Sequence, residues 1–238
     1  MLLLIKYTLL YGIVLMLVAL GGMFSEHSGI INIALEGIMV IGGVAGVLTL
    51  TMLPASLSPF LVVLISILVA ALAGVIYSLL LAFASINLKA DQTIGGTALN
   101  LMAPALVLFF IRIIANQNTL QMLTGDAASW FMIKKSTLGI DKNTDLGFFG
   151  ETFVNKVYLA TYVCILLFII LSILLYKTRF GLRLRACGEN PQAADSLGIN
   201  VYKMRYAGVV ISGALGAIGG LAYIVPPVQT LSLIHISE

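Results

Sequence analysis

Long apolar runs alternate with short polar stretches over almost the whole chain. A transmembrane helix needs about 20 apolar residues in succession, and six runs meet or approach this length. They cover residues 7–24, 30–53, 60–86, 94–115, 158–176 and 206–225. The pattern therefore predicts an all-α fold, a polytopic bundle of about six transmembrane helices.

The composition agrees with this pattern. Of the 238 residues, 60% are hydrophobic and 10% are charged, whereas an ordinary soluble domain has about 25% charged residues. The first apolar run follows a single lysine, Lys6, and no small-x-small cleavage site precedes Ser25. We therefore interpret this run as a retained membrane span rather than a secretory signal.

The distribution of charge predicts the topology. Residues 177–205 carry an excess of basic over acidic side chains, which marks this stretch as cytoplasmic. Alternation of the spans then places residues 116–156, where the charges cancel, outside, and the amino terminus outside as well. The outer loop is compatible with a small cap or a re-entrant segment. The charges of the inner stretch are Lys177, Arg179, Arg183, Arg185, Lys203 and Arg205 against Glu189 and Asp195.

A first polar segment, residues 25–37, leads into the second span. If it is helical, Asn32 and Glu36 lie four residues apart on one face with Ser28 a further turn back. Because polar groups at membrane depth usually face a water-filled path or another helix, Asn32 and Glu36 are candidate solute-path residues. The alternative is that Glu36 lies near the cytoplasmic interface and Asn32 caps or bridges helices.

A second polar segment, residues 91–100, begins the fourth span. It places Gln92, Thr93 and Asn100 at or inside the membrane, and its paired glycines, Gly95 and Gly96, are expected to weaken the helix. Broken helices with polar ends often line solute sites in transporters. Neutral amides and hydroxyls suit a sugar or a nucleobase, so we predict a small polar solute. The one basic candidate, Arg112, is expected to reach for the outer interface.

Small residues recur four apart within the spans. Such pairs lie on one helix face and allow close helix packing. We expect packing within the chain, with a subunit interface as the alternative. The pairs are Gly42 with Gly46, Ala70 with Gly74, and Ser212 with Gly216 and Gly220.

Motifs for enzymatic chemistry are missing from the sequence. It contains no P-loop, no H-E-x-x-H helix and no G-x-S-x-G elbow, so we expect no catalytic residue. Cys164 and Cys187 have no metal-ligand spacing, so neither a metal nor a cofactor is predicted. Basic and aromatic residues are not interleaved on a polar stretch, which argues against a nucleic-acid partner.

The inner stretch contains the signals of a short helix. Asn190 can cap a helix that begins at Pro191, continues over residues 192–197 and ends at Gly198. A short exposed helix is suited to docking a separate subunit. Alternatively, the basic residues only fix topology and touch anionic lipid headgroups, which accounts for Lys177 and Arg179.

Three segments together resemble one transporter family. They read RACGENPQAADSLGINVYKMRYAGVVISGALGAIGGLAY from Arg185, EHSGIINIALEGIMVIGG from Glu26 and ADQTIGGTALNL from Ala90. They resemble ABC permeases that import branched-chain amino acids, ribose-type sugars and nucleosides, most of all the nucleoside or simple-sugar branch. The likeness covers about residues 17–228.

The resemblance implies a membrane subunit of an ATP-driven importer in the bacterial cytoplasmic membrane. It implies that residues 189–198 form a coupling helix seated in a cleft of an ATP-binding subunit. The other implied partners are a second permease subunit, identical or different, and a solute-binding lipoprotein or periplasmic protein. The implied coupling residues are Glu189, Asn190, Pro191, Ala194, Asp195 and Gly198.

The end of the chain departs from the family. Relatives continue through further spans, whereas residues 231–238 resemble a translated sequencing adapter. We therefore expect residues 1–230 to be a partial permease domain and residues 231–238 to be an artefactual tail, with a natural short tail as the alternative. The rival function is a secondary transporter or channel. Such a protein would be expected to have a relay of charged residues within the membrane, and Glu36 by itself is weak support for one. A membrane enzyme is a more distant third.

Overall fold

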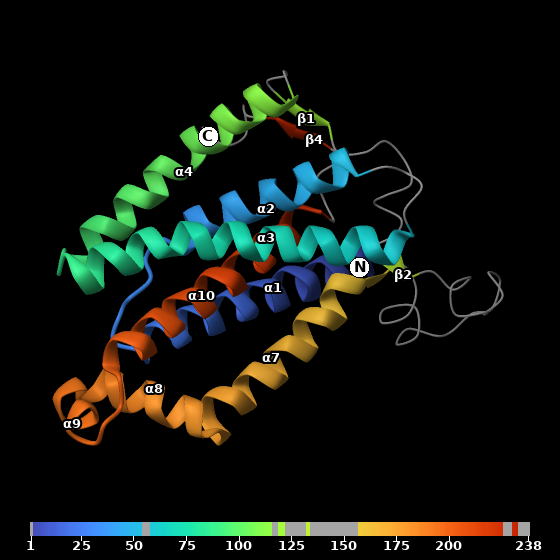
Figure 1. Ribbon diagram of the computed structural model, residues 1–238. Coiled ribbons are helices and arrows are strands. Elements are labelled where there is room, and N and C mark those ends of the chain that lie inside the picture. The colour runs from blue at the N-terminus through green and yellow to red at the C-terminus, as the bar shows by residue number, and fades with distance from the viewer. Residues whose placement is uncertain are drawn as a thin grey trace.

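The computed structural model describes residues 2–53, 58–115, 119–121, 132–133, 157–225 and 230–232. The described residues form a helical bundle with two very short pairs of strands (Figure 1). The helices are α1 (Leu2–Glu26), α2 (Leu35–Met52), α3 (Pro59–Ala82) with the π-helical turn η1 (Phe83–Asn87), α4 (Gln92–Ala115), α7 (Leu159–Lys177), α8 (Arg179–Glu189), α9 (Pro191–Ser196) and α10 (Val201–Ile224). The prediction of an all-α membrane bundle is confirmed.

Five of these helices are long and apolar enough to cross a membrane by themselves: α1, α2, α3 with η1, α4 and α10. The sixth predicted span is α7, which continues into α8 through a bend of 66°. Four of the predicted starting points differ from the observed ones by a few residues. The helix predicted from residue 30 begins at Leu35, while α1, α4 and α10 begin earlier than expected.

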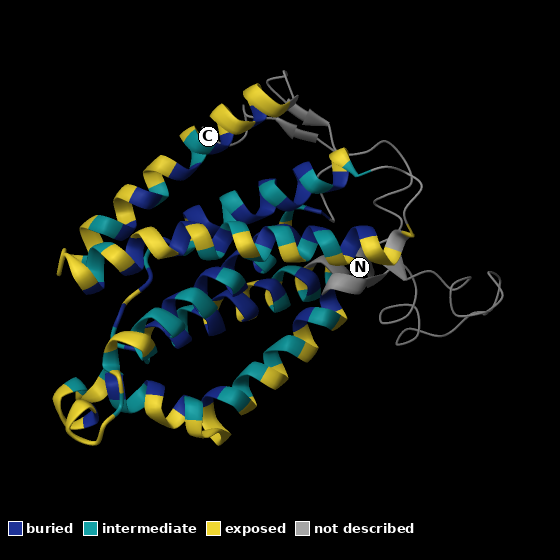
Figure 2. Cartoon of the chain, in the orientation of Figure 1, coloured by how far each residue is buried: buried dark blue, intermediate teal, exposed yellow. Residues whose placement is uncertain are grey.

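Helix α10 forms the centre of the bundle. It packs against α1, α2 and α3, while α4 lies outside α2 and α7 lies outside α1 (Figure 1). In the apolar stretch that could span the membrane, 61% of α10 is buried inside the bundle, against 22% of α4. Figure 2 shows the exposed outer faces of α4 and α7. Apolar clusters on both sides include α10, through Leu221 towards α2 and α3 and through Leu215 towards α1 and α7.

The small residues allow α10 to approach its neighbours closely. A Cβ atom added at Gly42 would lie 2.5 Å from the Cα atom of Ala217, and one added at Gly74 would lie 2.5 Å from the Gly213 carbonyl oxygen. Ala70 is fully buried in the core. The expected packing within the chain is confirmed at these positions. Cys164 is part of the same buried interior, in the cluster between α1 and α7.

The strands are peripheral. Strand β1 (Thr119–Gln121) pairs antiparallel with β4 (Thr230–Ser232), and β2 (Met132–Ile133) pairs antiparallel with β3 (Val157–Tyr158). Apart from these strands, the expectations for residues 116–156 and for the tail at residues 231–238 fall outside the described residues.

Candidate functional site

The first predicted path segment is not a helix. Residues 27–34, which we call the α1–α2 linker, run without regular structure between α1 and α2. Ser25 Oγ donates to the Ile30 carbonyl at 2.7 Å, Ser28 Oγ donates to the Ser25 carbonyl at 2.6 Å, and Gly29 has a φ of +86°. These local bonds compete with a helical ladder, and a left-handed residue ends one. The condition under which Ser28, Asn32 and Glu36 would share one helix face is therefore not met.

Helix α4 holds this linker in place. Gln92 Oε1 accepts from the Ile31 amide at 2.7 Å. Asn100 makes two bonds, because its Oδ1 accepts from the Gly37 amide at 2.8 Å and its Nδ2 donates to the Ile33 carbonyl at 2.8 Å. The Gly37 amide belongs to the first turn of α2, where no residue of the same helix can accept from it. Gln92 and Asn100 thus serve the backbone of a neighbouring segment.

The paired glycines do not break α4, which is continuous from Gln92 to Ala115. The expected discontinuity in α4 is therefore not observed, and Gly96 serves packing instead. A Cβ atom added at Gly96 would lie 2.8 Å from the Cβ atom of Ile33. The small residue lets the linker lie directly on the helix, and the discontinuity is in the linker instead.

Asn32 is the most buried of the predicted path residues. Its side chain is 6% exposed and its Nδ2 donates to Ser212 Oγ on α10 at 2.9 Å. It therefore bridges two segments, as the alternative interpretation expected. Its Oδ1, however, has no hydrogen-bond partner among the described residues. A buried acceptor without a partner is costly, and Asn32 Oδ1 is the one polar side-chain atom of the predicted path residues that is buried and lacks a donor among the described residues.

The other two predicted path residues are exposed. Glu36 lies in the first turn of α2, where a negative charge is favourable. Thr93 lies in the first turn of α4, and its amide donates to Asp91 Oδ1 at 2.7 Å. Asp91 Oδ1 also accepts from the Ile94 amide. These two hydrogen bonds hold the pKa of the Asp91 carboxyl below its usual value, and the bond from Ile94 has the larger effect. This cap of α4 was missed in the sequence.

The predicted short helix is present as α9. Asn190 Oδ1 accepts from the Ala193 amide at 3.0 Å, Pro191 is the first helical residue, and Gly198 has a φ of +78° after the helix ends at Ser196. Two further features were not predicted. The basic stretch before α9 is itself a helix, α8, whose last residue is Glu189, and Asn200 caps α10 by accepting from the Lys203 amide.

The predicted coupling residues differ in exposure. Four of them, Glu189, Asn190, Asp195 and Gly198, are exposed and Pro191 is half-buried. Ala194 is only 2% exposed, so it fixes α9 to the bundle and does not offer a contact surface. The largest apolar surface at α9 comes from Leu197, which is 79% exposed directly after the helix. This side chain was not predicted as a contact, because the sequence does not show whether a leucine is exposed.

The α8–α9 unit touches the linker directly. A Cβ atom added at Gly188 would lie 2.5 Å from the His27 carbonyl oxygen, and one added at Gly208 on α10 would lie 2.5 Å from Ser28 Cβ. The Arg205 guanidinium lies over Gly29, and its Nε has no hydrogen-bond partner among the described residues. The linker is therefore held between α8 and α10 on one side and α4 on the other.

Replacing Gly188 with alanine is expected to loosen this contact. The new methyl group would overlap backbone atoms of the linker, which cannot rotate away as a side chain can. Overpacking of this kind costs about 1–3 kcal/mol. Hydrogen exchange of the amides at residues 28–34 should rise by about tenfold or more. Gly95→Ala is the control, because its Cβ atom would meet only Leu81 Cδ1 at 3.6 Å. Unchanged exchange in Gly188→Ala would show that α8 does not restrain the linker.

Several known transport proteins are similar to this chain over most of its length. The family described as branched-chain amino acid transport system / permease component matches residues 4–231. The nucleoside ABC transporter permease protein NupC of Lactococcus lactis is 42% identical over 218 residues, which is 90% of this chain. The guanosine ABC transporter permease protein NupQ of Bacillus subtilis is 42% identical over 219 residues, or 91% of this chain. The putative glucose ABC transporter permease protein TsgC13 of Haloferax volcanii is 29% identical over 87% of this chain.

The chain spans 65% of the length of NupC and of NupQ, and 58% of TsgC13. No solved structure gives a significant match. The family match covers nearly all described helices, and the helices themselves are those of a multi-pass membrane protein. The chain therefore belongs to the branched-chain amino acid transport system / permease component family.

Proposed function

We propose that this chain forms the membrane-spanning part of an ABC importer for a nucleoside or a related small polar solute. The observation that carries the proposal is its 42% identity, over about nine-tenths of its length, to two proteins named as nucleoside and guanosine ABC transporter permeases. The importer would reside in the bacterial cytoplasmic membrane, with α8 and α9 on the cytoplasmic side.

Coupling to a separate ATP-binding subunit is proposed for α9. Its caps at both ends make it a rigid unit, and buried Ala194 fixes it to the bundle. Glu189, Asn190 and Asp195 would offer polar contacts, while Leu197 would fill an apolar pocket of the partner. Movement of α9 would pass through α8 to the linker at Gly188. A second permease subunit and an external solute-binding protein would complete the importer.

The solute path is proposed to pass the α1–α2 linker. Non-helical backbone at membrane depth is tolerated where it is packed in protein or faces a water-filled path, and Asn32 offers a buried acceptor there. Gln92 bonds to the linker at Ile31, Thr93 is next to Gln92, and Glu36 follows the linker in α2; these three remain path candidates. Each polar atom of Asn100 already has a backbone partner, which supports a positioning role for Asn100.

Substitution at Leu197 tests the coupling proposal. Leu197→Glu puts a charge on the apolar surface beside α9, and loss of a docking anchor of this kind costs about 2 kcal/mol or more. We expect at least about a tenfold lower recovery of the ATP-binding subunit with the membrane chain from detergent extracts. Leu88→Glu is the matched control, since Leu88 is 66% exposed in the connection before α4.

Equal recovery with Leu197→Glu and the unchanged chain would contradict docking at α9. Solute uptake into vesicles by the assembled importer tests the rest of the proposal. Uptake should require ATP, and unlabelled nucleosides should compete with it while a branched-chain amino acid should not. Uptake that follows an ion gradient without ATP would instead identify a secondary transporter.

A further inference from the structure

The bend between α7 and α8 is a fixed feature of the fold. Thr178 Oγ1 accepts from the Gly181 amide at 3.3 Å and donates to the Leu174 carbonyl at 2.5 Å, so one side chain joins both helices. Gly181 packs against the Leu175 carbonyl, where no larger side chain fits. These contacts therefore fix the 66° bend, and with it the direction of α8 relative to α7.

Helix α8 has two different faces. Gly181, Leu184 and Cys187 are buried against the bundle. Leu182 and Arg183 are three and four residues from Arg179, so both lie next to Arg179 on the helix surface. All three are exposed, and Leu182 is 63% exposed. We call these three residues, together with Lys177 at the end of α7, the elbow face.

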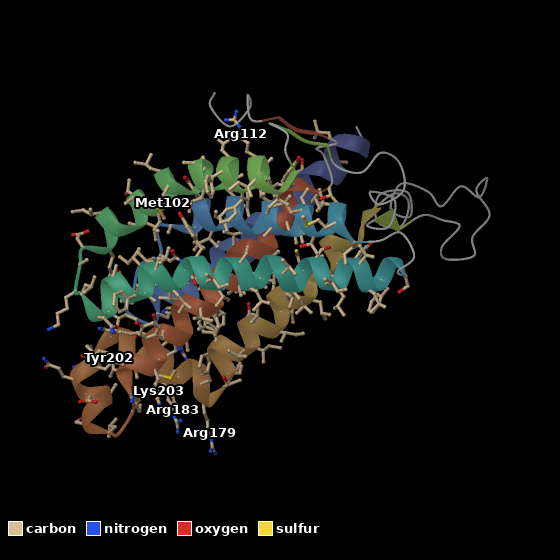
Figure 3. All side chains as sticks on the ribbon, turned by 45° about the horizontal axis from the view of Figure 1, so that its top comes forward. Met102, Arg112, Arg179, Arg183, Tyr202 and Lys203 are labelled. Carbon is tan, nitrogen blue, oxygen red and sulfur yellow. The ribbon has the colours of Figure 1, made fainter. Side chains whose placement is uncertain are left out.

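The positive charges of the elbow face are not neutralised within the fold. Among the described residues, the side chains of Lys177, Arg179 and Arg183 have no hydrogen bond or ion pair. Figure 3 shows Arg179 and Arg183 pointing away from the helices, at the opposite end of the molecule from Arg112.

Along the chain, the elbow face directly follows an exposed apolar stripe of α7. Leu166, Ile169 and Ile173 are 59%, 51% and 53% exposed at helical spacing, which is the surface expected to face lipid tails. This stripe ends at Tyr176, which is 47% exposed and carries the Arg185 guanidinium 5.4 Å from its ring centre. Tyrosine at the end of a span marks the headgroup region of the bilayer. Lys177 and Arg179 follow immediately.

We propose that the elbow face is a binding site for the phosphate of an anionic phospholipid. Arg179 and Arg183 supply guanidinium groups, whose fork geometry matches phosphate oxygens, and Lys177 adds a further positive charge. Leu182 contacts the upper part of an acyl chain. The position of the elbow face directly after the lipid-facing stripe of α7 favours a lipid over a protein partner, because a docking subunit would have to displace bilayer there. The site does not depend on the proposed importer function.

Lipid binding to the purified chain tests this proposal. The chain in detergent is titrated with phosphatidylglycerol or with phosphatidylcholine, and bound lipid is counted by native mass spectrometry. Phosphatidylglycerol should bind more tightly, and the Arg179→Gln/Arg183→Gln variant should lose about tenfold or more of that affinity. The double lysine variant, Arg179→Lys/Arg183→Lys, should retain part of it because the charge remains. Lys203→Gln is the control, since Lys203 is an exposed cation on α10 at the same end of the bundle.

Several results would overturn the proposal. One is equal binding of the two lipids, and another is unchanged phosphatidylglycerol binding in the glutamine variant with the same thermal stability as the unchanged chain. Inorganic phosphate that displaces the lipid at equal concentration would identify a soluble anion as the ligand. Loss of ATP-binding-subunit recovery in the glutamine variant, with lipid binding intact, would assign the face to protein docking.

Discussion

Replacing Gly220 with valine is expected to destabilise the bundle severely, because α2 and α10 meet there through their backbones. A Cβ atom at this position would lie against the Met39 carbonyl oxygen and 2.6 Å and 2.7 Å from the carbonyl carbon and Cα atom of Met39. All three are backbone atoms of α2, so no side chain can rotate away. The central pair α2 and α10 must move apart, and overpacking of a well-packed core costs about 3 kcal/mol at the upper end of its usual range.

The measurement is the thermal unfolding midpoint in detergent, together with the yield of monodisperse protein. Gly12→Ala is the control, because a Cβ atom at Gly12 of α1 meets nothing within 4 Å. That substitution should be neutral or slightly stabilising, since alanine favours the helical conformation more than glycine does. A Gly220→Val variant as stable as Gly12→Ala would show that α2 and α10 do not depend on this close approach.

Replacing Asn100 with leucine is expected to release the α1–α2 linker and the start of α2 together. Leucine is similar in size but leaves the Gly37 amide and the Ile33 carbonyl without their partners. Each unpaired buried group costs about 1–3 kcal/mol. The unfolding midpoint should fall, and hydrogen exchange of the amides at residues 33–37 should rise well beyond that of the remaining helices.

Thr97→Val is the matched control for Asn100→Leu. Thr97 lies on α4 one turn earlier, is exposed, and donates only to the Thr93 carbonyl of its own helix at 2.8 Å. Asn100→Asp should be intermediate, because an aspartate can still accept from Gly37 but cannot donate to Ile33. If Asn100→Leu exchanges no faster than Thr97→Val, Asn100 does not position the linker.

The membrane spans and the α9 cap could be predicted because their causes are local. About 20 consecutive apolar residues suffice to identify a span, whatever the rest of the chain does. Likewise, Asn190, Pro191 and Gly198 act within a single turn of α9. The resemblance to ABC permeases rests on the same kind of contiguous segments, and the family match over residues 4–231 agrees with it.

The helix geometry assumed in the solute-path prediction is wrong for a related reason, while the path itself stays a prediction. It assumed that polar residues four apart share a helix face, which fails because Ser25, Ser28 and Gly29 divert the backbone between α1 and α2. It also assumed that paired glycines weaken a helix, whereas Gly96 makes room for Ile33. A serine or a glycine is compatible with several backbone conformations, and the contacts with neighbouring helices decide which one forms.

The sequence by itself determined the class of protein, the number and approximate position of its spans, and the short capped helix, because these follow from solvent transfer and from bonds within one turn. The tertiary structure decided what the polar residues do. Asn32 meets Ser212 across 180 positions, and Asn100 completes the first turn of α2 across 63. Such pairings exist only after the helices have packed around α10, so no pattern along the chain records them.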